Sequence, residues 1–389
     1  MADKFQIHIF TSEEHIESEA EILSGFLNSG LDCLHIRKPG WTYERVEELL
    51  RKLPANHLSN VTLHSYPELA LKYKAGFQMN SRTGHIDFEP VSLSRSCHTL
   101  HEVEDSSELD FVTLSPVFDS ISKSGYKASG IIDGIKPERF KTKVIALGGV
   151  ELSRLDSLRS LGFSGAALLG SVWNRPSGVS EMLKFLRMRN YRFQFITDGT
   201  DIQSTLAQAS EALEGGCRWI QVRMKNSDTG EIRETLQELL PHCEQKCATL
   251  IVDDYVELCS YCHGVHLGQN DIPVADARKM LPEEKIIGLT ANNLEQIKES
   301  ETSLPDYYGI GPFRFTSTKK NLAPVLGIEG YRKIIPEIKR PFVAIGGILP
   351  DDIPEMQQAG ISGYAVSSVI TKSSDPVEMT SKLSKIINI

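Results

Sequence analysis

Cations, carboxylates, hydroxyls and glycines follow one another in the second half of the chain, each group at the end of a short apolar run. The motifs are Gln221-Val222-Arg223-Met224-Lys225, Asp253-Asp254, Gly268-Gln269-Asn270-Asp271, Thr290, Thr316-Ser317-Thr318-Lys319, Gly346-Gly347 and Ser367-Ser368. Cations and hydroxyls donate to phosphate oxygens, and carboxylates bind hard divalent cations. Together the motifs predict a site for a metal-bound diphosphate and a second phosphate.

Two acids are the candidate metal ligands. Asp254 and Asp271 are predicted to follow neighbouring strands, where their carboxylates would converge. Mg²⁺ is typically held by one or two carboxylates and completes its shell with phosphate oxygens and water. The alternative is that each acid only caps a helix or faces solvent. In the company of the other motifs we favour the metal.

Two basic residues alternate with apolar ones at the end of a predicted strand. Period-two geometry puts Gln221, Arg223 and Lys225 on one face of that strand. If this face lines the interior of a closed sheet, the cations need an anionic partner. The bland alternative is an exposed strand end.

The later motifs offer backbone and hydroxyl groups. Gly346-Gly347 and Ser367-Ser368 follow the last two runs, which is where barrels of alternating strands and helices usually bind phosphate. The glycines are equally compatible with a tight turn that excludes side chains. His266 lies within a run, and a hydrogen-bonded core histidine is at least as good an explanation for it as a catalytic one.

The elements that position these motifs form a repeating pattern. Short apolar runs at 193–197, 219–224, 249–252, 264–268, 286–290, 307–311, 342–346 and 363–367 alternate with stretches of helical length. Such continuous runs are typical of parallel strands buried on both faces, and eight of them usually close into a barrel. An open doubly wound sheet is the structural alternative, but it would not bring all the motifs to one axis.

The first half repeats this plan. Val144-Ile145-Ala146-Leu147-Gly148-Gly149 parallels Phe342-Val343-Ala344-Ile345-Gly346-Gly347, and similar pairs occur at other runs. The join at 187–192 has no spacer rich in glycine, serine or proline. We therefore predict an α/β protein of two tandem (β/α)8 TIM barrels, with domains at 1–189 and 190–389.

Composition limits the function classes. The 389 residues are 40% hydrophobic and 24% charged, as in ordinary globular proteins, and the net charge of −9 argues against a nucleic-acid or anionic-membrane surface. The N-terminus has no apolar stretch as long as that of a signal peptide, and no segment is long and apolar enough to span a membrane. We therefore expect a cytoplasmic protein with small-molecule partners. The sequence leaves open whether the chain forms a homo-oligomer. The Cys243/Cys247 and Cys259/Cys262 pairs allow a zinc hypothesis, but buried structural thiols are favoured.

With these motifs in view, residues 191–389 resemble the thiamine-phosphate synthase (thiamine-phosphate pyrophosphorylase) family. The resemblance implies that a hydroxymethylpyrimidine diphosphate is joined to a thiazole phosphate, giving thiamine phosphate and pyrophosphate. It implies Mg²⁺ at Asp254 and Asp271, and a catalytic role for Arg223, Lys225 and Lys319. The implied ligands of the pyrimidine diphosphate are Gln221, Arg223, Lys225, Asp253, Thr290 and Lys319, where Asp253 replaces the family's Asn. Those of the thiazole phosphate are Thr316, Thr318, Gly347, Ser367 and Ser368.

The first half resembles the same superfamily, closer to its thiazole tautomerase-like branch. His64-Ser65 stands where the acid pair would be, and Ser81-Arg82-Thr83 stands where Asp271 would be, so the carboxylate site is lost. Arg37, Lys123, Gly148-Gly149 and Gly170-Ser171 are retained, which suits phosphate binding. The branch's catalytic histidine is replaced within Leu114-Ser115-Pro116-Val117, and His35, expected at the mouth of the second strand, is the candidate substitute. We predict that this half is a phosphate-binding or structural domain. One alternative is a bifunctional enzyme whose first half is a thiazole phosphate tautomerase, and another is that the whole chain is a non-enzymatic phosphate-ligand sensor.

Overall fold

The sheet in each half of the chain closes on itself. The computed structural model describes residues 4–80, 89–119, 140–315 and 323–387. Within these ranges the strands form two closed barrels of eight parallel strands each. The predicted pair of tandem TIM barrels is confirmed. No helix among the described residues is long and apolar enough to cross a membrane.

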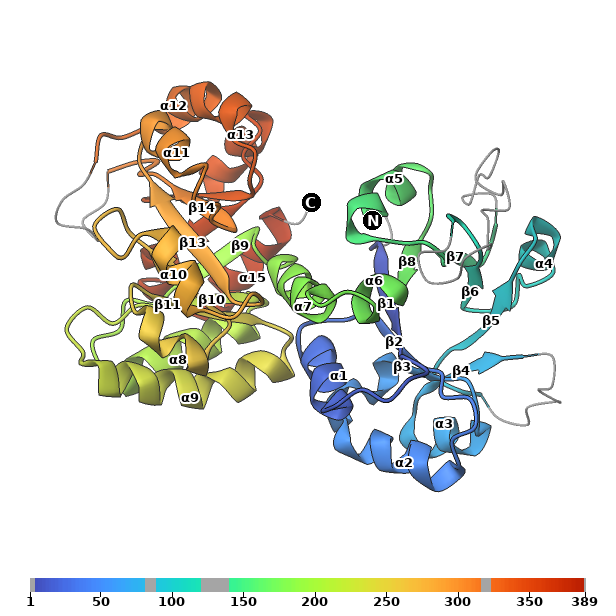
Figure 1. Ribbon diagram of the computed structural model, residues 1–389. Helices are drawn as coiled ribbons and strands as arrows, with labels where there is room; N and C mark the ends of the chain where they lie inside the picture. Colours follow the sequence, from blue (N-terminus) through green and yellow to red (C-terminus); the bar gives the residue numbers. More distant parts are fainter. Residues whose placement is uncertain (1–3, 81–88, 120–139, 316–322, 388–389) are drawn as a thin grey trace. The chain divides into compact units, whose positions relative to one another are not determined.

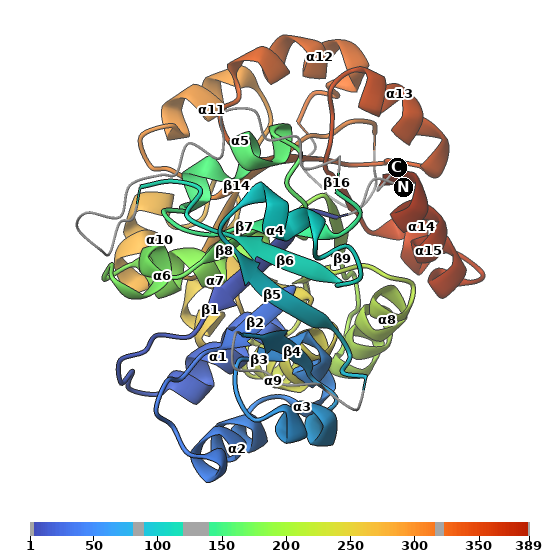
Figure 2. The ribbon, with the colours of Figure 1, turned by 90° about the vertical axis from the view of Figure 1, so that its right-hand side faces the viewer.

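Helices follow most strands of the first barrel (Figures 1 and 2), but among the described residues none lies between β4 and β5 or between β6 and β7. Its strands are β1 (Gln6–Phe10), β2 (Cys33–Ile36), β3 (Val61–Leu63), β4 (Gly76–Met79), β5 (Leu93–Cys97), β6 (Phe111–Leu114), β7 (Lys143–Ala146) and β8 (Gly165–Leu168). Its helices are α1 (Glu19–Asn28), α2 (Tyr43–Lys52), α3 (Pro67–Tyr73), α4 (Leu100–Glu104), α5 (Leu155–Ser160), α6 (Gly170–Trp173) and α7 (Gly178–Met188).

The second barrel follows directly. Its strands are β9 (Phe193–Ile196), β10 (Trp219–Val222), β11 (Thr249–Asp253), β12 (Gly264–Leu267), β13 (Ile286–Ala291), β14 (Tyr307–Ile310), β15 (Phe342–Ile345) and β16 (Tyr364–Val366). Its helices are α8 (Ile202–Glu214), α9 (Thr229–Gln245), α10 (Val274–Met280), α11 (Leu294–Ser300), α12 (Gly327–Ile334), α13 (Ile353–Gln358), α14 (Ser368–Thr371) and α15 (Pro376–Ile387). The chain divides into compact units at Met182 and Leu183, within α7, and the predicted boundary at 189/190 follows that helix.

Helix α9 illustrates why these segments fold as they do. Asp228 caps it by accepting from the amides of Gly230 and Glu231, and the Glu231 carboxylate in turn accepts from the Asp228 amide. This reciprocal box satisfies amides that have no partner within the helix. Ile232, Leu236 and Leu239 repeat at helical spacing and are buried. The helix therefore has one apolar stripe that packs on the barrel.

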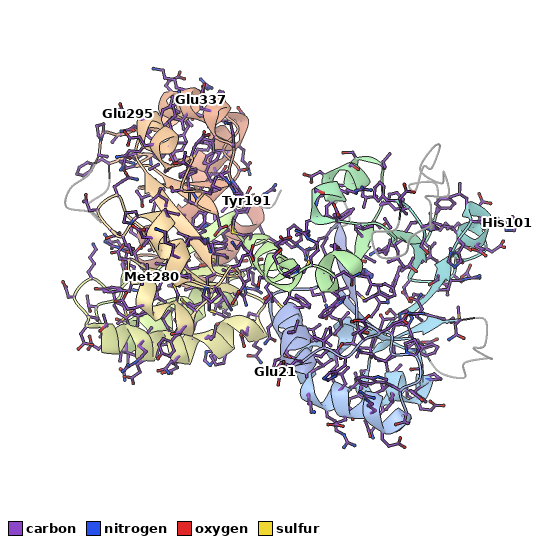
Figure 3. All side chains as sticks on the ribbon, viewed as in Figure 1. Glu21, His101, Tyr191, Met280, Glu295 and Glu337 are labelled. Atoms are coloured by element: carbon purple, nitrogen blue, oxygen red, sulfur yellow. The ribbon has the colours of Figure 1, made fainter. Side chains whose placement is uncertain are left out.

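Alternate residues of the strands in the second barrel enter two different cores. Phe195, Ile220 and Val252 pack outward in the large cluster beneath the helices. A smaller cluster lies inside the barrel and contains Ile196, Trp219, Ile251, Ile286, Tyr307, Val343 and Ala365. The exposed side chains of Glu295 and Glu337 project from the outer helices of this barrel, as those of Glu21 and His101 do in the first (Figure 3). Because the interior of the second barrel is mostly apolar, a polar side chain that points inward needs a hydrogen-bond partner or a ligand.

Candidate active site

Because all strands of the second barrel run parallel, their carboxyl ends meet at one end, the mouth. The motifs predicted from the sequence lie there, after or within the last residues of β10, β11, β12, β13, β15 and β16. Thr316, Ser317, Thr318 and Lys319 follow β14 but lie outside the described residues.

Arg223 is paired with a carboxylate of its own chain. Its Nε lies 2.9 Å from Asp253 Oδ2, and Gln221 donates to Asp253 Oδ1 at 2.6 Å. Thr197 fixes the start of the loop, because its hydroxyl accepts from the Arg223 amide at 2.9 Å. Asp253 therefore supplies the anionic partner that an inward-facing cation requires. Lys225, further along the loop, is exposed.

The two predicted metal ligands come together. The carboxyl groups of Asp254 and Asp271 share a side-chain hydrogen bond. Asp271 in addition accepts a hydrogen bond from the Gly268 amide at 2.6 Å, which anchors its carboxylate at the end of β12. Loss of solvent around the carboxyl, followed by the charges of Asp253 and Asp271, raises the pKa of Asp254 to about 7, although the residue as a whole stays exposed. Asp254 also has a positive φ of 68°. Crowded carboxylates and an uncommon backbone conformation at one point are typical of a functional site.

Thr290 is held by an internal hydrogen-bond chain. Its hydroxyl lies 2.9 Å from His266 Nε2, and His266 Nδ1 lies 2.9 Å from the Tyr307 hydroxyl. Gly288 and Gly309 make room for these rings, since a Cβ at Gly288 would lie 2.3 Å from Tyr307 Cζ. His266 is thus a buried, hydrogen-bonded core residue that orients a residue of the mouth.

The glycine pair after β15 is required by close packing. Gly346 and Gly347 have positive φ values of 101° and 70°, and a Cβ on Gly346 would lie 2.9 Å from Pro312 Cβ. The Arg314 amide donates to the Gly346 carbonyl at 2.9 Å, and its guanidinium lies 2.6 Å from Asp352. Sequence reasoning missed Arg314, because only its pairing with an acid beyond the glycines shows its place at the mouth.

The hydroxyl pair after β16 completes the mouth. Ser367 Oγ is buried and has no hydrogen-bond partner among the described residues. Ser367 and Ser368 stand at the start of α14, with Ser367 as its N-cap. A buried hydroxyl without a partner is costly, so this atom suits a ligand that would occupy the mouth.

The first barrel keeps the frame of this mouth and changes its chemistry. The Arg37 amide donates to Thr11 Oγ1 at 3.0 Å, just as the Arg223 amide donates to Thr197. Gly148 and Gly149 repeat the positive φ values, at 95° and 65°. Strand registers align His64 with Asp253, so an imidazole replaces the carboxylate there.

Two expectations for the first barrel are wrong. Ser367-Ser368 corresponds to Leu169-Gly170, not to Gly170-Ser171, because α6 begins at Gly170 as α14 begins at Ser368. Ser171 instead donates to the Val150 carbonyl at 2.9 Å. His35 does not lie at the mouth but is fully buried below it. Ser81-Arg82-Thr83 and Lys123 lie outside the described residues.

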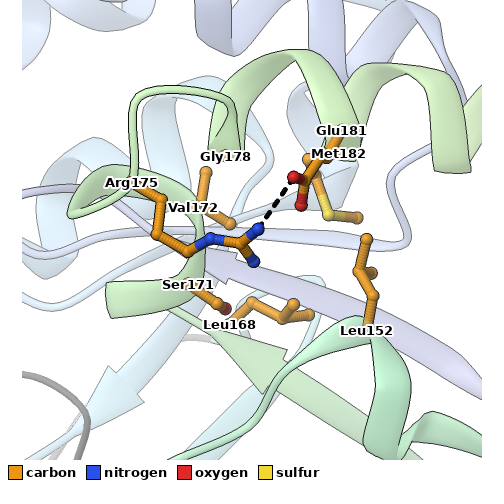
Figure 4. A pocket seen from close by; sticks show the side chains of 8 residues that line it. All are labelled: Leu152, Leu168, Ser171, Val172, Arg175, Gly178, Glu181 and Met182. Atoms are coloured by element: carbon orange, nitrogen blue, oxygen red, sulfur yellow. Dashed lines mark hydrogen bonds and ion pairs between the residues drawn. The ribbon is translucent and has the colours of Figure 1, made fainter.

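A small pocket in the first barrel does not add a ligand site (Figure 4). It lies among Leu152, Leu168, Met182 and the ion pair of Arg175 with Glu181, whose atoms are 2.8 Å apart. Its volume of about 10 Å³ has room for about one water molecule. Of the two cysteine pairs in the second barrel, Cys243, Cys259 and Cys262 are buried, as expected for structural thiols, whereas Cys247 is only half-buried.

Comparison with known proteins identifies the second barrel. A family model described as thiamine monophosphate synthase matches residues 193–370. Thiamine-phosphate synthase of Bacteroides fragilis is 49% identical over 197 residues, which are 49% of this chain and 97% of that protein. The one of Flavobacterium psychrophilum is 40% identical over 201 residues, 50% of this chain and 98% of that protein. A solved thiamine phosphate pyrophosphorylase of Pyrococcus furiosus is 34% identical, with a TM-score of 0.46, and covers 51% of this chain and 96% of that one.

These matches span about half of the chain, and the family model lies within the second barrel. The sequence identity and the complete coverage of the relatives agree with the ordered set of motifs at the mouth. Through its second barrel, the chain belongs to the thiamine-phosphate synthase family.

Proposed function

We propose that the second barrel is a Mg²⁺-dependent thiamine-phosphate synthase. It condenses 4-amino-2-methyl-5-hydroxymethylpyrimidine diphosphate with a thiazole phosphate and releases pyrophosphate. The observation that carries the proposal is the meeting of Arg223, Asp254 and Asp271 at one mouth. Relatives named thiamine-phosphate synthase, up to 49% identical, support the same reaction.

The donor set fits Mg²⁺. Asp254 and Asp271 offer hard oxygen ligands, and the raised pKa of Asp254 reflects first the loss of solvent around its carboxyl and then the negative charges of Asp253 and Asp271. A divalent cation between these carboxylates would relieve that repulsion, and diphosphate oxygens and water would complete its shell. When bound, Mg²⁺ supplies positive charge against the diphosphate.

The residues of the chain have two tasks in this reaction, to neutralise the leaving group and to orient the diphosphate. The bond from the exocyclic CH₂ carbon to the diphosphate oxygen breaks, and its electron pair leaves with pyrophosphate. The lone pair of the thiazole nitrogen forms the new C–N bond. Arg223, Lys225 and Lys319 neutralise the charge that develops on the leaving group, while Gln221 and Thr290 orient the diphosphate. No protein nucleophile is needed.

Asp253 sets the resting state of this site. It is part of the proposed diphosphate-binding set, but as a carboxylate it acts through Arg223, which it holds at 2.9 Å, and through Gln221. The guanidinium is therefore already aimed before a ligand arrives. Such preorganisation avoids a reorganisation cost during the reaction.

The thiazole phosphate is proposed to bind at the opposite part of the mouth. Its ligands would be Thr316, Thr318, Gly347, Ser367 and Ser368. The buried hydroxyl of Ser367, which has no partner among the described residues, supports this assignment. Gly347 would contribute its backbone, because a Cβ at this position would lie 3.1 Å from Arg314 Cβ and crowd it.

The first barrel is proposed to bind a phosphate-bearing ligand or to serve a structural role, without synthase chemistry. His64 and Leu169 stand where the second barrel has Asp253 and Ser367. A thiazole phosphate tautomerase is the second candidate, supported by His64 next to the charge of Arg37. In that case His64→Gln would slow product formation only when the carboxylated thiazole tautomer is supplied.

Synthesis of thiamine phosphate by the full chain, with Mg²⁺ or with EDTA, tests the main proposal. Asp254→Ala and Asp271→Ala are each expected to reduce the rate by roughly 10²-fold or more while circular dichroism stays unchanged. Asp276→Ala, on the outer helix α10, is the matched control and should keep full activity. Product formation without a divalent ion would refute the metal, and no product under any condition would refute the synthase.

A further inference from the structure

A sulfur and two imidazoles meet inside the first barrel. His8 Nδ1 lies 2.9 Å from His35 Nε2, and the same His35 nitrogen lies 3.5 Å from Cys33 Sγ. One ligating atom from each of the three residues lies within 4.8 Å of the others. Among the described residues, these three side chains are the one set of three or more His, Cys, Asp or Glu residues whose ligand atoms lie close enough to share a metal ion.

The spacing is close to that of a metal site. In a tetrahedral zinc site with bonds of about 2.0–2.3 Å, neighbouring ligand atoms are about 3.3–3.6 Å apart. The Cys33–His35 separation of 3.5 Å falls in that range, and the His8–His35 separation of 2.9 Å needs only a small opening. In the metal-free arrangement the two imidazoles share a hydrogen bond instead.

The outer nitrogen of each histidine already has a partner. His8 Nε2 lies 3.4 Å from Gln6 Oε1, which can only accept, and His35 Nδ1 lies 3.1 Å from His64 Nε2. Histidines that bind metals usually donate their second N–H to such a partner, which fixes the ring. With protons on these outer nitrogens, His8 Nδ1 and His35 Nε2 carry no proton, so both are free to bind an ion together with Cys33 Sγ.

We propose that the first barrel binds one Zn²⁺ ion through His8 Nδ1, Cys33 Sγ and His35 Nε2. Zn²⁺ is bound in proteins by neutral imidazole and thiolate, which is the donor set present here. Binding releases the thiol proton of Cys33 to solvent, so the site changes by one positive charge. Thr62 Oγ1, 3.2 Å from Cys33 Sγ, or a water molecule completes the coordination.

Burial supports the neutral histidines that this site needs. Burial lowers the pKa of His8 to about 4 and holds that of His35 well below its usual value. The thiol behaves oppositely, because burial raises the pKa of Cys33 to about 12. Only a bound cation would make the thiolate favourable in this interior.

The second barrel offers no such site at the same positions. Strand registers align His8 with Gln194, Cys33 with Trp219 and His35 with Gln221. Trp219 fills the second interior and packs edge to face against Tyr307, with ring centroids 5.3 Å apart. The first barrel has the small Cys33 in place of this large ring, so a metal would link β1 to β2 there, beside the rings of Phe10 and Phe111 that pack against His35.

The site is closed to solvent, since His8, Cys33 and His35 are exposed by only 1%, 7% and 0%. We therefore expect the ion to bind as the barrel folds and to exchange slowly. The test uses the full chain expressed in medium supplemented with zinc or with cobalt and purified without chelator. Metal content is measured by mass spectrometry and the ligand shell by X-ray absorption.

The expected result is one zinc per chain with one sulfur and two imidazole nitrogens in its shell. The cobalt form should show a thiolate charge-transfer band and tetrahedral d–d bands. Cys33→Ser, and His8→Gln combined with His35→Gln, should reduce the metal content to background. Cys259→Ser, a buried thiol of the second barrel, is the control and should change nothing. His64→Gln should weaken zinc affinity by roughly 10–100-fold.

Three results would overturn the proposal. They are a chain without zinc after growth in supplemented medium, a shell with two or more sulfurs, and a charge-transfer band that survives Cys33→Ser. The absorption measurement on the unmodified chain decides the question even if a variant does not fold. Metal content is measured independently of thiamine phosphate synthesis, so a failure of the zinc proposal leaves the proposed synthase function intact, and the reverse is also true.

Discussion

At the scale of single residues, the mouth of the second barrel is defined by carboxylates that one guanidinium neutralises only in part. Asp253 accepts from Gln221 and pairs with Arg223, while Asp254 adds a further carboxylate beside Asp271. The sequence predicted that these residues would meet. It did not predict the pairing of Asp253 with Arg223, because that contact depends on how two neighbouring strands align.

Asp254 makes the stability of the metal-free protein depend on pH. Its folded pKa of about 7 lies above the unfolded value of 3.8, so the folded state binds this proton more tightly. The contribution of Asp254 to stability is therefore lost as pH rises from about 4 to 7. In EDTA, Asp254→Asn should melt a few degrees above the original protein at pH 8, with a smaller difference at pH 5.

Thermal unfolding followed by circular dichroism checks this, with Asp276→Asn as a control that shows no such difference. Adding Mg²⁺ at pH 8 should raise the melting temperature of the original protein and not that of Asp254→Asn. If Asp254→Asn melts lower than the original protein at pH 8, the carboxylate crowding is not as described.

At the scale of elements, apolar runs were sufficient to locate the strands. Runs such as 307–311 and 342–346 became β14 and β15 because buried parallel strands are apolar on both faces. Depth within the barrel was harder to predict. His35 and Arg37 lie on the same face of β2, yet one is fully buried and the other reaches the mouth. A shift of one residue after β8 likewise put Leu169 where a hydroxyl was expected.

The inner packing of the second barrel gives a prediction at this scale. A Cβ at Gly288 would lie 2.3 Å from Tyr307 Cζ and 2.6 Å from His266 Nδ1. Both rings are buried, so Gly288→Ala must displace them and weaken the chain that holds Thr290. We expect a loss of roughly 1–3 kcal/mol in the free energy of unfolding, measured by urea denaturation.

Gly309→Ala is the comparison, because its Cβ would meet only His266, at 2.9 Å, and the loss should be smaller. An unchanged urea midpoint for Gly288→Ala would mean that the two rings can move at no cost. Activity should fall with the first variant more than with the second, since Thr290 loses its support.

At the scale of the whole molecule, two barrels share one plan and differ in their mouths. The amides of Arg37 and Arg223 are held by equivalent threonines, so the two arginines are matched positions. The carboxylates that surround Arg223 have no counterpart at His64 and Ser65. A cytoplasmic location and any oligomer stay predictions from the sequence.

This match permits a test of which barrel performs the synthesis. Arg223→Ala should lower kcat/KM for thiamine phosphate formation by roughly 10²–10³-fold, because it removes a cation that we propose to face the leaving diphosphate. Arg37→Ala should leave that rate within about twofold, because no synthase site surrounds it. Steady-state kinetics on both variants is the measurement. A large loss with Arg37→Ala would assign synthesis to the first barrel or to both.

The internal pairing of Arg223 with Asp253 also governs which anions the resting protein attracts. Three acids, Asp253, Asp254 and Asp271, stand around one guanidinium, so a bare polyanion such as a nucleotide or orthophosphate meets repulsion there. Under the proposed function, a diphosphate that arrives with its own divalent ion would be attracted by the same carboxylates. If the proposed metal site holds, the free chain would discriminate against metal-free phosphates, and the divalent ion would be required for the diphosphate to bind.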